Sequence, residues 1–549
     1  MSDWTSGYVA DVDYTHGFFR ELTPAVMAHS AVSRGQMHTL NRPGLTYCEL
    51  GCGQGFTANL LAAANPHIEF HAMDFMPGHI ANARELAAEA GLENVHFYER
   101  SFADFEQEED LPKQFDVIAL HGVFSWVSKE NQQLILDFIG RRLASGGMVY
   151  VSYNSMVAWA SAIPLRKVML DRAARSNAPI TDKVDDALIF ANELEAVGAK
   201  FFIDNPSASA RLSSAATMPR DYLAHELFNA DWTPFHFADL AAQMGQAKLD
   251  FLGSSCVLDH VDDISLTPKQ IDFLAAEVDP VCREDLRDVL VNEQFRSDLF
   301  VKGGRKHTER GAVGAWFETP LSLSMRYNGG TLKLRWRQGE IALDHAEYGP
   351  ILKALSAGPA TVRNLLDQGA FGRMNWGQIS RLLTILVGSE ILTPCLPLEG
   401  IESRRSRCEV FNLAVCTRAE ESESLGFLAS PVTGGGIELD RFEQLFLLAH
   451  SEGMKLPSDW AEMVWGLMSA QGQRLQHEGQ VLEHDADNLA LLKARAAAFA
   501  SRRLPMCEAL GVVPGQKPAK QQQQPESSTE VPEDRVKLGT ERLRQESAA

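Results

Sequence analysis

The sequence predicts an α/β protein with a mainly parallel sheet in its first 300 residues. Short apolar strands alternate there with amphipathic helices of crossover length, which is typical of a sheet covered by helices on both faces. A glycine-rich turn, Gly51-Cys-Gly-Gln-Gly55, follows the first strand, and an acid, Asp74, ends the second. Such a turn lets the backbone approach a ligand closely, so we expect a binding site at this edge of the sheet.

The order of strands and helices supports this prediction from residue 45 onward. Asn65-Pro66 ends the first helix, and Gly91 follows the second helix at the position where glycine favours a helix end. The expected elements, in chain order, are a strand at 45–50, a helix at 56–64, a strand at 68–73, a helix at 78–90, strands at 95–98 and 115–120, a helix at 130–143 and a strand at 148–153.

Beyond residue 153 the alternation loosens. Residues 155–235 are expected to form a mainly helical insertion over the sheet. A helix at 237–244 and strands at 249–257 and 297–301 come next, and we expect the two strands to close the same sheet as an antiparallel pair. The alternative, that they belong to a separate second domain, stays open at this point.

Three further regions follow residue 303, and none of them shows the strand–helix alternation. The last is low in complexity and almost free of apolar residues, so it cannot offset the entropy of becoming ordered. The regions are a winged-helix-like module at 304–400 with short helices at 348–357, 361–368 and 376–387, a mainly helical region at 401–514, and a disordered tail at 515–549.

Composition excludes several classes of protein. The 549 residues include 72 acidic and 51 basic side chains, a net charge of −21, and such a surface repels the phosphates of nucleic acids. No apolar run reaches the roughly 20 residues that span a bilayer, and the first residues lack the segments of a secretory signal. The eight cysteines form no CxxC pair, which argues against a zinc ribbon or a disulfide framework. We expect a cytoplasmic protein with no membrane partner.

The acids beside the glycine turn favour a cationic ligand. Asp74 lies about 20 residues beyond the turn, where an acid can accept the ribose hydroxyls of an adenosine. Glu49 precedes the turn, and its carboxylate would repel the pyrophosphate of a dinucleotide. Phe56 also stands where the dinucleotide motif has its third glycine. These residues favour a cofactor with an amino group and a sulfonium, S-adenosylmethionine (SAM), over a nicotinamide dinucleotide.

With these motifs the sequence resembles the class I SAM-dependent methyltransferases, and in particular the bacterial ones that carry a methyltransferase regulatory domain. That family includes protein lysine methyltransferases. The resemblance reaches to about residue 303 and implies a Rossmann-like, seven-stranded class I methyltransferase sheet at 41–303, a regulatory region at about 218–303, and an N-terminal cap at 1–40. It rests on YTHGFFRELTP (14–24), LHGVFSWVS (120–128), YVSYNS (150–155) and PRDYLAHELFNADWTPFHFADLAAQMG (219–245).

The resemblance also implies residue roles. Ser101-Phe102 stands where class I enzymes often place an acid against the adenine, so that contact departs from the usual pattern. His121 follows the fourth strand, beneath the reacting centre of this fold. The cofactor-binding residues implied are Glu49, Gly51, Gly53 and Gly55 at the methionine part, Asp74 at the ribose, Phe75, Ser101 and Phe102 at the adenine, and His121.

Candidates for the acceptor side lie at the carboxyl edge of the sheet, where open α/β sheets bind ligands. By position these are His121, Trp126, Tyr153 and Asn154, although Trp126 suits a core position equally well. Tyr14 and His16 follow from the resemblance alone. An aromatic lining would attract a cationic or methylated amine. We expect catalytic roles for His121, Tyr153, Asn154 and Tyr14.

The leading hypothesis for function is therefore SAM-dependent N-methylation of lysine side chains in a protein substrate. The length of chain beyond the sheet favours a macromolecular acceptor, and a small-molecule acceptor stays open as the alternative. A nucleic-acid-binding regulator is less favoured, because the helix expected at 376–387 holds a single arginine and is largely apolar. The oligomeric state is left open, with a homodimer among the alternatives.

Overall fold

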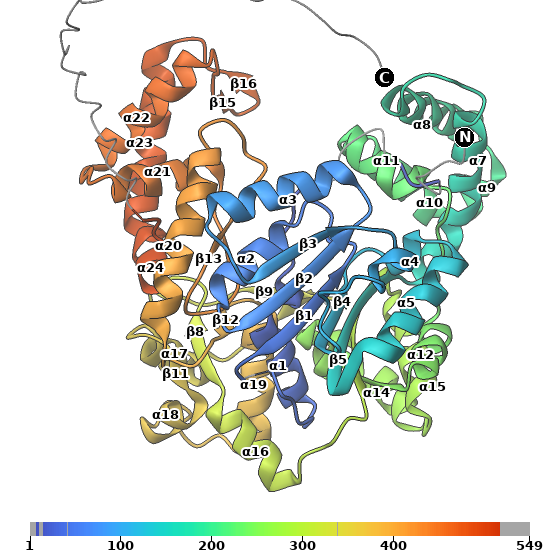
Figure 1. Ribbon diagram of the computed structural model, residues 1–549, viewed down its shortest axis with the longest axis horizontal. Helices are drawn as coiled ribbons and strands as arrows, with labels where there is room; N and C mark the ends of the chain where they lie inside the picture. The colour runs from blue at the N-terminus through green and yellow to red at the C-terminus, as the bar shows by residue number, and fades with distance from the viewer. Residues whose placement is uncertain (1–6, 10–14, 41, 338, 516–549) are drawn as a thin grey trace, which may run out of the picture. The chain divides into compact units, whose positions relative to one another are not determined.

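The computed structural model describes residues 7–9, 15–40, 42–337 and 339–515, and its centre is a seven-stranded sheet of order β3-β2-β1-β4-β5-β7-β6 (Figure 1). The antiparallel strand β7 lies between β5 and β6, so the last two strands close the same sheet and the separate-domain alternative is wrong. The predicted fold class is confirmed. The strands are β1 (Leu45–Leu50), β2 (Ile68–Asp74), β3 (Val95–Glu99), β4 (Phe115–Leu120), β5 (Leu143–Asn154), β6 (Leu249–Ser254) and β7 (Phe295–Lys302).

Burial explains the strength of the strand signal in the centre of the sheet. All six residues of β4 are buried, because a central strand of a parallel sheet is covered on both faces. The covering helices include α2 (Phe56–Ala64), whose nine residues are all buried. The other helices near the sheet are α1 (Pro24–Ser33), α3 (Pro77–Glu89), α4 (Phe102–Phe105), α5 (Lys129–Arg142) and α12 (Phe237–Gln246).

The junction of α5 and β5 differs from the prediction. We expected a helix at 130–143 and a strand at 148–153, with Gly146 and Gly147 between them, but β5 begins at Leu143, directly after the helix. Leu143 pairs with Phe115 and Met148 pairs with Val117, so residues 144–147 form an irregular bulge in the ladder. The glycines therefore lie within the strand, where their backbone freedom accommodates the bulge.

The predicted helical insertion is present and has its own apolar core, in which Leu188, Leu212 and Phe228 are buried. Its helices gather beside the sheet (Figure 1). They are α6 (Met156–Trp159), α7 (Ile163–Ala173), α8 (Ile180–Ala196), α9 (Lys200–Asp204), α10 (Pro206–Ala215) and α11 (Arg220–Phe228), and between β6 and β7 follow α13 (Asp262–Ser265), α14 (Pro268–Ala275) and α15 (Pro280–Val291).

The next region combines a small antiparallel sheet with helices. Strands β8 (Pro320–Leu323), β11 (Ala360–Thr361) and β12 (Leu392–Pro394) form it in the order β11-β8-β12. The helix in the position of a recognition helix, α19 (Trp376–Gly388), buries seven residues, and its Arg381 pairs with Asp263 of α13. The remaining elements are α16 (Glu309–Glu318), the hairpin β9 (Leu334–Trp336) and β10 (Gly339–Ile341), α17 (His345–Leu355) and α18 (Val362–Asp367).

The C-terminal region shares one core with the central sheet. Phe411 of α20 (Ile401–Arg418) stacks on Phe56 of α2 with ring centroids 6.2 Å apart. The region is mainly helical, as predicted, and within it β15 (Gln476–His477) and β16 (Gln480–Val481) form a short hairpin. The other elements are β13 (Phe427–Ala429), β14 (Gly436–Glu438), α21 (Arg441–Ser451), α22 (Pro457–Ala470), α23 (Asp485–Arg502) and α24 (Leu504–Ala509).

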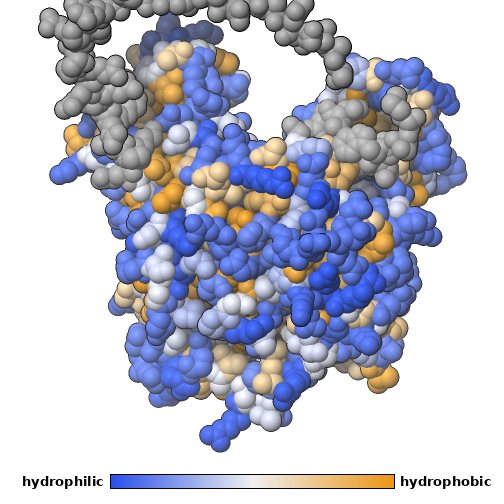
Figure 2. Space-filling model, viewed as in Figure 1, coloured by the Kyte–Doolittle hydropathy of each residue, from blue (hydrophilic) through white to orange (hydrophobic). Residues whose placement is uncertain are grey.

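The visible surface is mostly hydrophilic, with apolar side chains scattered over it (Figure 2). Among the described residues, no helix combines the length and the apolar character that crossing a bilayer requires. The predicted tail lies outside the described residues except for Gly515.

Candidate active site

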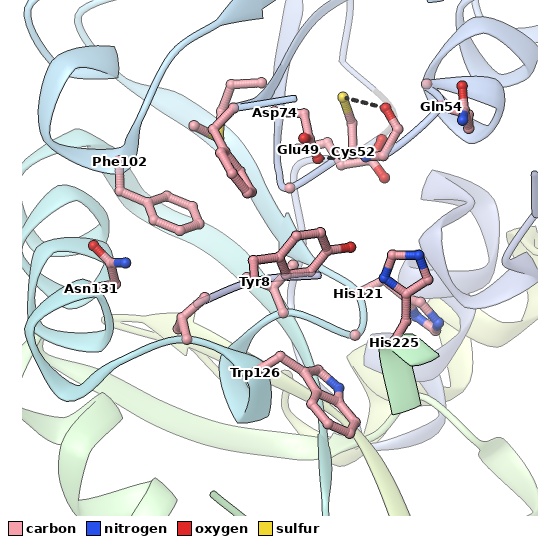
Figure 3. A pocket seen from close by; sticks show the side chains of 18 of the residues that line it. Tyr8, Glu49, Cys52, Gln54, Asp74, Phe102, His121, Trp126, Asn131 and His225 are labelled. Carbon is pink, nitrogen blue, oxygen red and sulfur yellow. Dashed lines mark hydrogen bonds between the residues drawn. The ribbon is translucent and has the colours of Figure 1, made fainter. Parts of the chain in front are cut away.

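A cavity of about 620 Å³ lies at the carboxyl ends of β1, β2 and β4, where the sequence places its glycine turn (Figure 3). Glu49, Asp74 and His121 contribute to its walls from these strand ends. The N-terminal segment and the insertion also contribute, through Tyr8 and through His225 of α11. The cavity therefore joins parts of the chain more than 200 residues apart.

The glycine turn is held to the end of β2. The amides of Gly51 and Cys52 both donate to the carbonyl of Met73, at 2.9 Å. Gly51 and Gly55 have φ of 75° and 66°, and a Cβ at Gly51 would lie 2.5 Å from a methyl of Val123. Only glycine combines this left-handed backbone with so close an approach. Glycine at these positions thus lets the turn pack closely against Val123 and Ala83.

Two acids face this turn. Asp74 accepts from the amide of Gly53 through Oδ2 and from the amide of Met76 through Oδ1, each at 2.9 Å, which fixes the carboxylate and leaves a lone pair on each oxygen. Glu49 is 5% exposed, and burial together with the nearby charge of Asp74 raises its pKa to about 8. A buried carboxyl of this kind is ready to receive a cation.

The wall opposite this acid pair is mixed in character. Phe75, Ser101 and Phe102 line it, as expected, together with Asn131 of α5, which the sequence analysis missed. Ser101 caps α4 by accepting from the amide of Asp104, and its hydroxyl donates to the Asp104 carboxylate at 2.7 Å. Phe102 therefore offers a ring and Asn131 an amide at this end of the cavity (Figure 3).

His121 lines the cavity as a neutral ring. Its imidazole stacks on Phe19 with centroids 3.5 Å apart, and Nδ1 lies 2.8 Å from the hydroxyl of Tyr150. Burial lowers the pKa of His121 to about 3. Such an imidazole is a very weak base at neutral pH, so its surroundings oppose the expected role as proton acceptor. They favour a role in which the ring only shapes the cavity.

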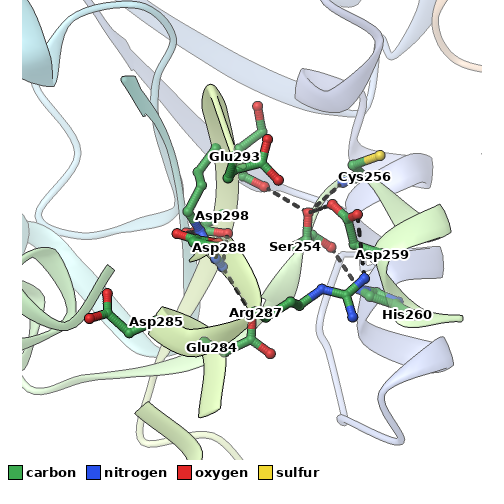
Figure 4. Close-up of polar contacts among 12 residues, drawn as sticks. Ser254, Cys256, Asp259, His260, Glu284, Asp285, Arg287, Asp288, Glu293 and Asp298 are labelled. Carbon is green, nitrogen blue, oxygen red and sulfur yellow. Dashed lines mark hydrogen bonds and ion pairs between the residues drawn. The ribbon is translucent and has the colours of Figure 1, made fainter. Parts of the chain in front are cut away.

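Tyr153 and Asn154 do not line the cavity, and the expectation that they would is wrong. Tyr153 is 1% exposed and its hydroxyl donates to Asp298 of β7 at 2.6 Å. Arg296 links Asp298 to Asp288 of α15, and these acids lie together in Figure 4. Asn154 is buried, and its backbone N–H donates to the hydroxyl of Ser125. Because successive residues of a strand point to opposite faces of the sheet, the pairing of β5 with β7 directs only the Tyr153 side chain into this buried polar layer.

Two predicted residues of the N-terminal segment have other outcomes. Tyr14 lies outside the described residues. His16 is not among the residues that line the cavity; its Nε2 lies 2.8 Å from the side-chain amide of Asn82 in α3. Asn82 also donates to Gln54 of the glycine turn, at 2.8 Å. His16 is therefore linked to the glycine turn through Asn82.

Comparisons with known proteins agree with this geometry. A methyltransferase domain family matches residues 41–189, and a predicted methyltransferase regulatory domain matches residues 219–302. The uncharacterized protein sll1526 of Synechocystis sp. is 37% identical over 509 residues, which cover 93% of this chain and 99% of that protein. The chain belongs to the SAM-dependent methyltransferases with a methyltransferase regulatory domain.

Two further proteins resemble this methyltransferase. The uncharacterized protein RP789 of Rickettsia prowazekii is 27% identical over 255 residues, 46% of this chain and 45% of that protein. A solved structure of PKMT2 from Rickettsia typhi in complex with AdoHcy matches with a TM-score of 0.68 and 17% identity, over 91% of this chain and 100% of that one. The structural likeness extends the shared fold beyond the two domains into the C-terminal region.

The cofactor of the methyltransferase is SAM, and the residues present fit it. The cavity beside the glycine turn and the buried Glu49 suit the methionine part with its amino group. Asp74 keeps lone pairs for the ribose hydroxyls, and Phe75, Ser101 and Phe102 lie at the end expected to receive the adenine. When bound, SAM supplies an electrophilic methyl group on a sulfonium.

Several cavity residues were not predicted. Glu226, Asn229 and Asp231 enter from α11 and the loop after it, and Trp126, which sequence alone left between core and pocket, also lines the cavity. Part of the signal was visible, since the His225-Glu226 pair lies in the stretch that carries the family resemblance. What the sequence did not show is which side chains of this helical insertion line the cavity.

Proposed function

We propose that this methyltransferase transfers the methyl group of SAM to the side-chain amine of lysine in a protein substrate. The observation that carries the proposal is the lining of the cavity at the glycine turn. It continues from the cofactor turn to a part lined by Tyr8 and Trp126 and by the carboxylates of Glu226 and Asp231. A lysine has a long apolar stem and a cationic tip, and this lining complements both.

The comparison with PKMT2, a protein lysine methyltransferase, supports the same proposal because the likeness includes the regions beyond the methyltransferase domain. The net charge of −21 also favours a cationic acceptor over a phosphate backbone. In the winged-helix-like region, α19 buries its apolar side chains and Arg381 is already paired with Asp263. We therefore propose a protein acceptor and not a nucleic acid.

The residues of the site divide the work of the proposed reaction. Glu49 and Asp74 hold the cofactor, Phe19 and Tyr150 hold His121 as a neutral wall, and α11 closes the acceptor side. Methyl transfer is an in-line displacement, so placing amine and sulfonium at attack distance supplies much of the rate. The amine must first lose a proton, because an ammonium has no lone pair with which to attack.

The proposal is tested by incubating the full chain with SAM labelled in its methyl group and a cell lysate. We expect label in protein bands, on lysine in peptides analysed by mass spectrometry. Label in a small-molecule fraction, or on a carboxylate or thiol, would refute a lysine acceptor. The Asp74→Asn variant serves as the control, because it weakens cofactor binding without altering the acceptor side.

A further inference from the structure

The acceptor side of the cavity holds a carboxylate that the cofactor does not need. Glu226 lies on α11, which belongs to the helical insertion and not to the strands that bind the cofactor. Asn229, Asp231 and the rings of Tyr8 and Trp126 line the same cavity. A carboxylate and two aromatic rings thus face the same space.

The charge of Glu226 is not neutralised by an ion pair. Burial raises its pKa to about 7, against the opposing influence of Arg211 and Arg166. Within the described residues, no hydrogen-bond donor reaches its carboxylate, and no cation lies within 4.0 Å of it. Glu226 is half-buried, and a desolvated carboxyl without partners is costly, so a protein retains one chiefly where a ligand completes it.

The two arginines near Glu226 are held by other groups. Arg211 lies over the ring of Trp159 at 3.8 Å and donates to the carbonyl of Ala158 at 3.2 Å. Arg166 lies over Trp232 at 5.0 Å and donates to the carbonyl of Asn229. Trp232 in turn contacts the cavity residue Trp126, with centroids 6.1 Å apart. These stacks keep both guanidinium groups in place while the carboxylate faces the cavity.

We propose that Glu226 binds the amine of the methyl acceptor and takes its proton, which makes it a catalytic residue of the acceptor site. This inference rests on the proposed function. The ammonium N–H bond breaks, its electron pair stays on nitrogen, and the proton moves to a Glu226 oxygen. The neutral amine then attacks the methyl carbon, the C–S bond breaks, and its electron pair remains on sulfur as the thioether. The proton on Glu226 returns to solvent through the open cavity.

The pKa of Glu226 depends on a small number of neighbouring charged groups. Arg166 comes from α7 and Arg211 from α10, and both favour the ionised form. On its own helix, Tyr222 feels the charge of Glu226, and Asp231 follows in the loop. Helix α8 packs against α11 through buried apolar side chains. We therefore expect one dominant ionisation near neutral pH on the acceptor side.

The test compares Glu226→Gln with Glu193→Gln, which removes the same charge from the exposed side of α8 in the same insertion. Methyl transfer to the labelled lysate proteins should fall about 100-fold at pH 7 in Glu226→Gln, the size expected for a lost proton acceptor. The deficit should shrink toward pH 10, where free lysine, with a reference pKa of about 10.4, deprotonates unaided. Glu193→Gln should match the wild type, and all three should bind SAM equally.

A binding measurement distinguishes a failure of this inference from a failure of the proposed function. The probe is n-butylamine, added at pH 8 to protein saturated with S-adenosylhomocysteine, with tryptophan fluorescence as the readout because Trp126 lines the cavity. Loss of a hydrogen bond to a charged group should weaken binding in Glu226→Gln by about tenfold or more. Glu226→Asp keeps the charge and should retain more turnover at pH 7 than Glu226→Gln.

The outcomes decide both proposals. Equal lysine methylation and equal amine binding in Glu226→Gln and wild type would overturn the role of Glu226 and leave lysine methylation standing. Equal losses in the Asp and Gln variants, with no recovery at high pH, would also overturn it, because that pattern indicates a structural residue. Label confined to small metabolites would overturn the proposed function, and the amine probe would then decide whether Glu226 binds a cationic acceptor.

Discussion

At the scale of single residues, the methyltransferase sets two buried acids side by side at the ends of neighbouring strands. β1 pairs with β2 in parallel, and Glu49 ends up close enough to Asp74 for the second charge to disfavour ionisation of the first. Two backbone amides donate to the carboxylate of Asp74 and stabilise its ionised form. Among the described residues, no hydrogen-bond donor stabilises the ionised form of Glu49 in this way. The two acids therefore differ in how they respond to pH.

Cofactor affinity should depend on pH through Glu49. With a pKa of about 8 the free protein holds this carboxyl mainly protonated at pH 7, and a cationic ligand favours the ionised form, so binding releases a proton. Affinity for SAM should rise between pH 6 and 8, by up to about tenfold per pH unit. Titration calorimetry in buffers of different ionisation enthalpy measures the released proton. A pH-independent Kd in wild type, or the same slope in Glu49→Gln, would contradict this assignment.

Tyr153 should matter for stability and not for chemistry. Its buried hydroxyl donates to Asp298, and hydrogen bonds to charged groups contribute about 1.5–3 kcal/mol. Tyr153→Phe should lower the free energy of unfolding by that amount and leave the Kd for SAM within twofold. Denaturation followed by fluorescence gives the first value and calorimetry the second. The control is Tyr327→Phe, whose bond to His345 is exposed; a turnover defect in Tyr153→Phe at normal stability would return Tyr153 to the mechanism.

At the scale of elements, the glycine turn is braced from the far end of the chain. Gln54 of the turn accepts from Asn82 of α3, and Asn82 accepts from Arg418 of α20 at 3.3 Å. Arg418 also pairs with Glu89 of α3 at 2.7 Å. Helix α20 lies beside α2 and α3 (Figure 1). The C-terminal region thus contacts the cofactor site through one intermediate helix.

Removing this brace should weaken cofactor binding modestly. Arg418→Gln loses the ion pair and weakens the hold on Asn82, and a bond of about 0.5–1.5 kcal/mol corresponds to a two- to tenfold rise in the Kd for SAM. Turnover at saturating SAM should stay near wild type. Arg405→Gln on the same helix, which breaks only an exposed pair with Glu402, is the control. An unchanged Kd in Arg418→Gln would mean that α20 does not support the turn.

At the scale of the whole molecule, the methyltransferase sheet and the C-terminal region form one hydrophobic core. Helix α2 is buried on every side, by the sheet on one face and by α20 and β13 on the other. Phe56, Leu60 and Phe411 belong to the same cluster as Leu445 and Trp460. The described residues, which lie between 7 and 515, correspondingly group as one compact unit. A methyltransferase domain without its C-terminal region would expose the outer face of α2.

Two truncations of the C-terminal half should differ in their effect on thermal stability. A chain ending at Gly400 exposes the apolar face of α2 and should aggregate or lose its cooperative thermal transition. A chain ending at Gly515 removes only the polar, low-complexity segment and should melt within about a degree of the full chain. Scanning calorimetry compares them. A stable, SAM-binding chain ending at Gly400 would show that the cores are independent.

The sequence by itself determined the central sheet, the glycine turn and the cofactor. Strands β1 and β4 and helix α2 match their predicted bounds, because fully buried strands and a glycine turn leave strong local patterns. Glu49 and Asp74 were found for the same reason, since each lies a fixed number of residues from that turn.

Only the tertiary structure decided the acceptor side. The strand-end rule placed Tyr153 in the site, but the antiparallel partner β7 offers Asp298 at hydrogen-bond distance and draws the hydroxyl into a buried polar layer. Glu226 lines the cavity because α11 of the helical insertion returns to the cavity wall about 70 residues after the end of β5. No local pattern encodes such a return, which depends on packing between segments far apart in the chain.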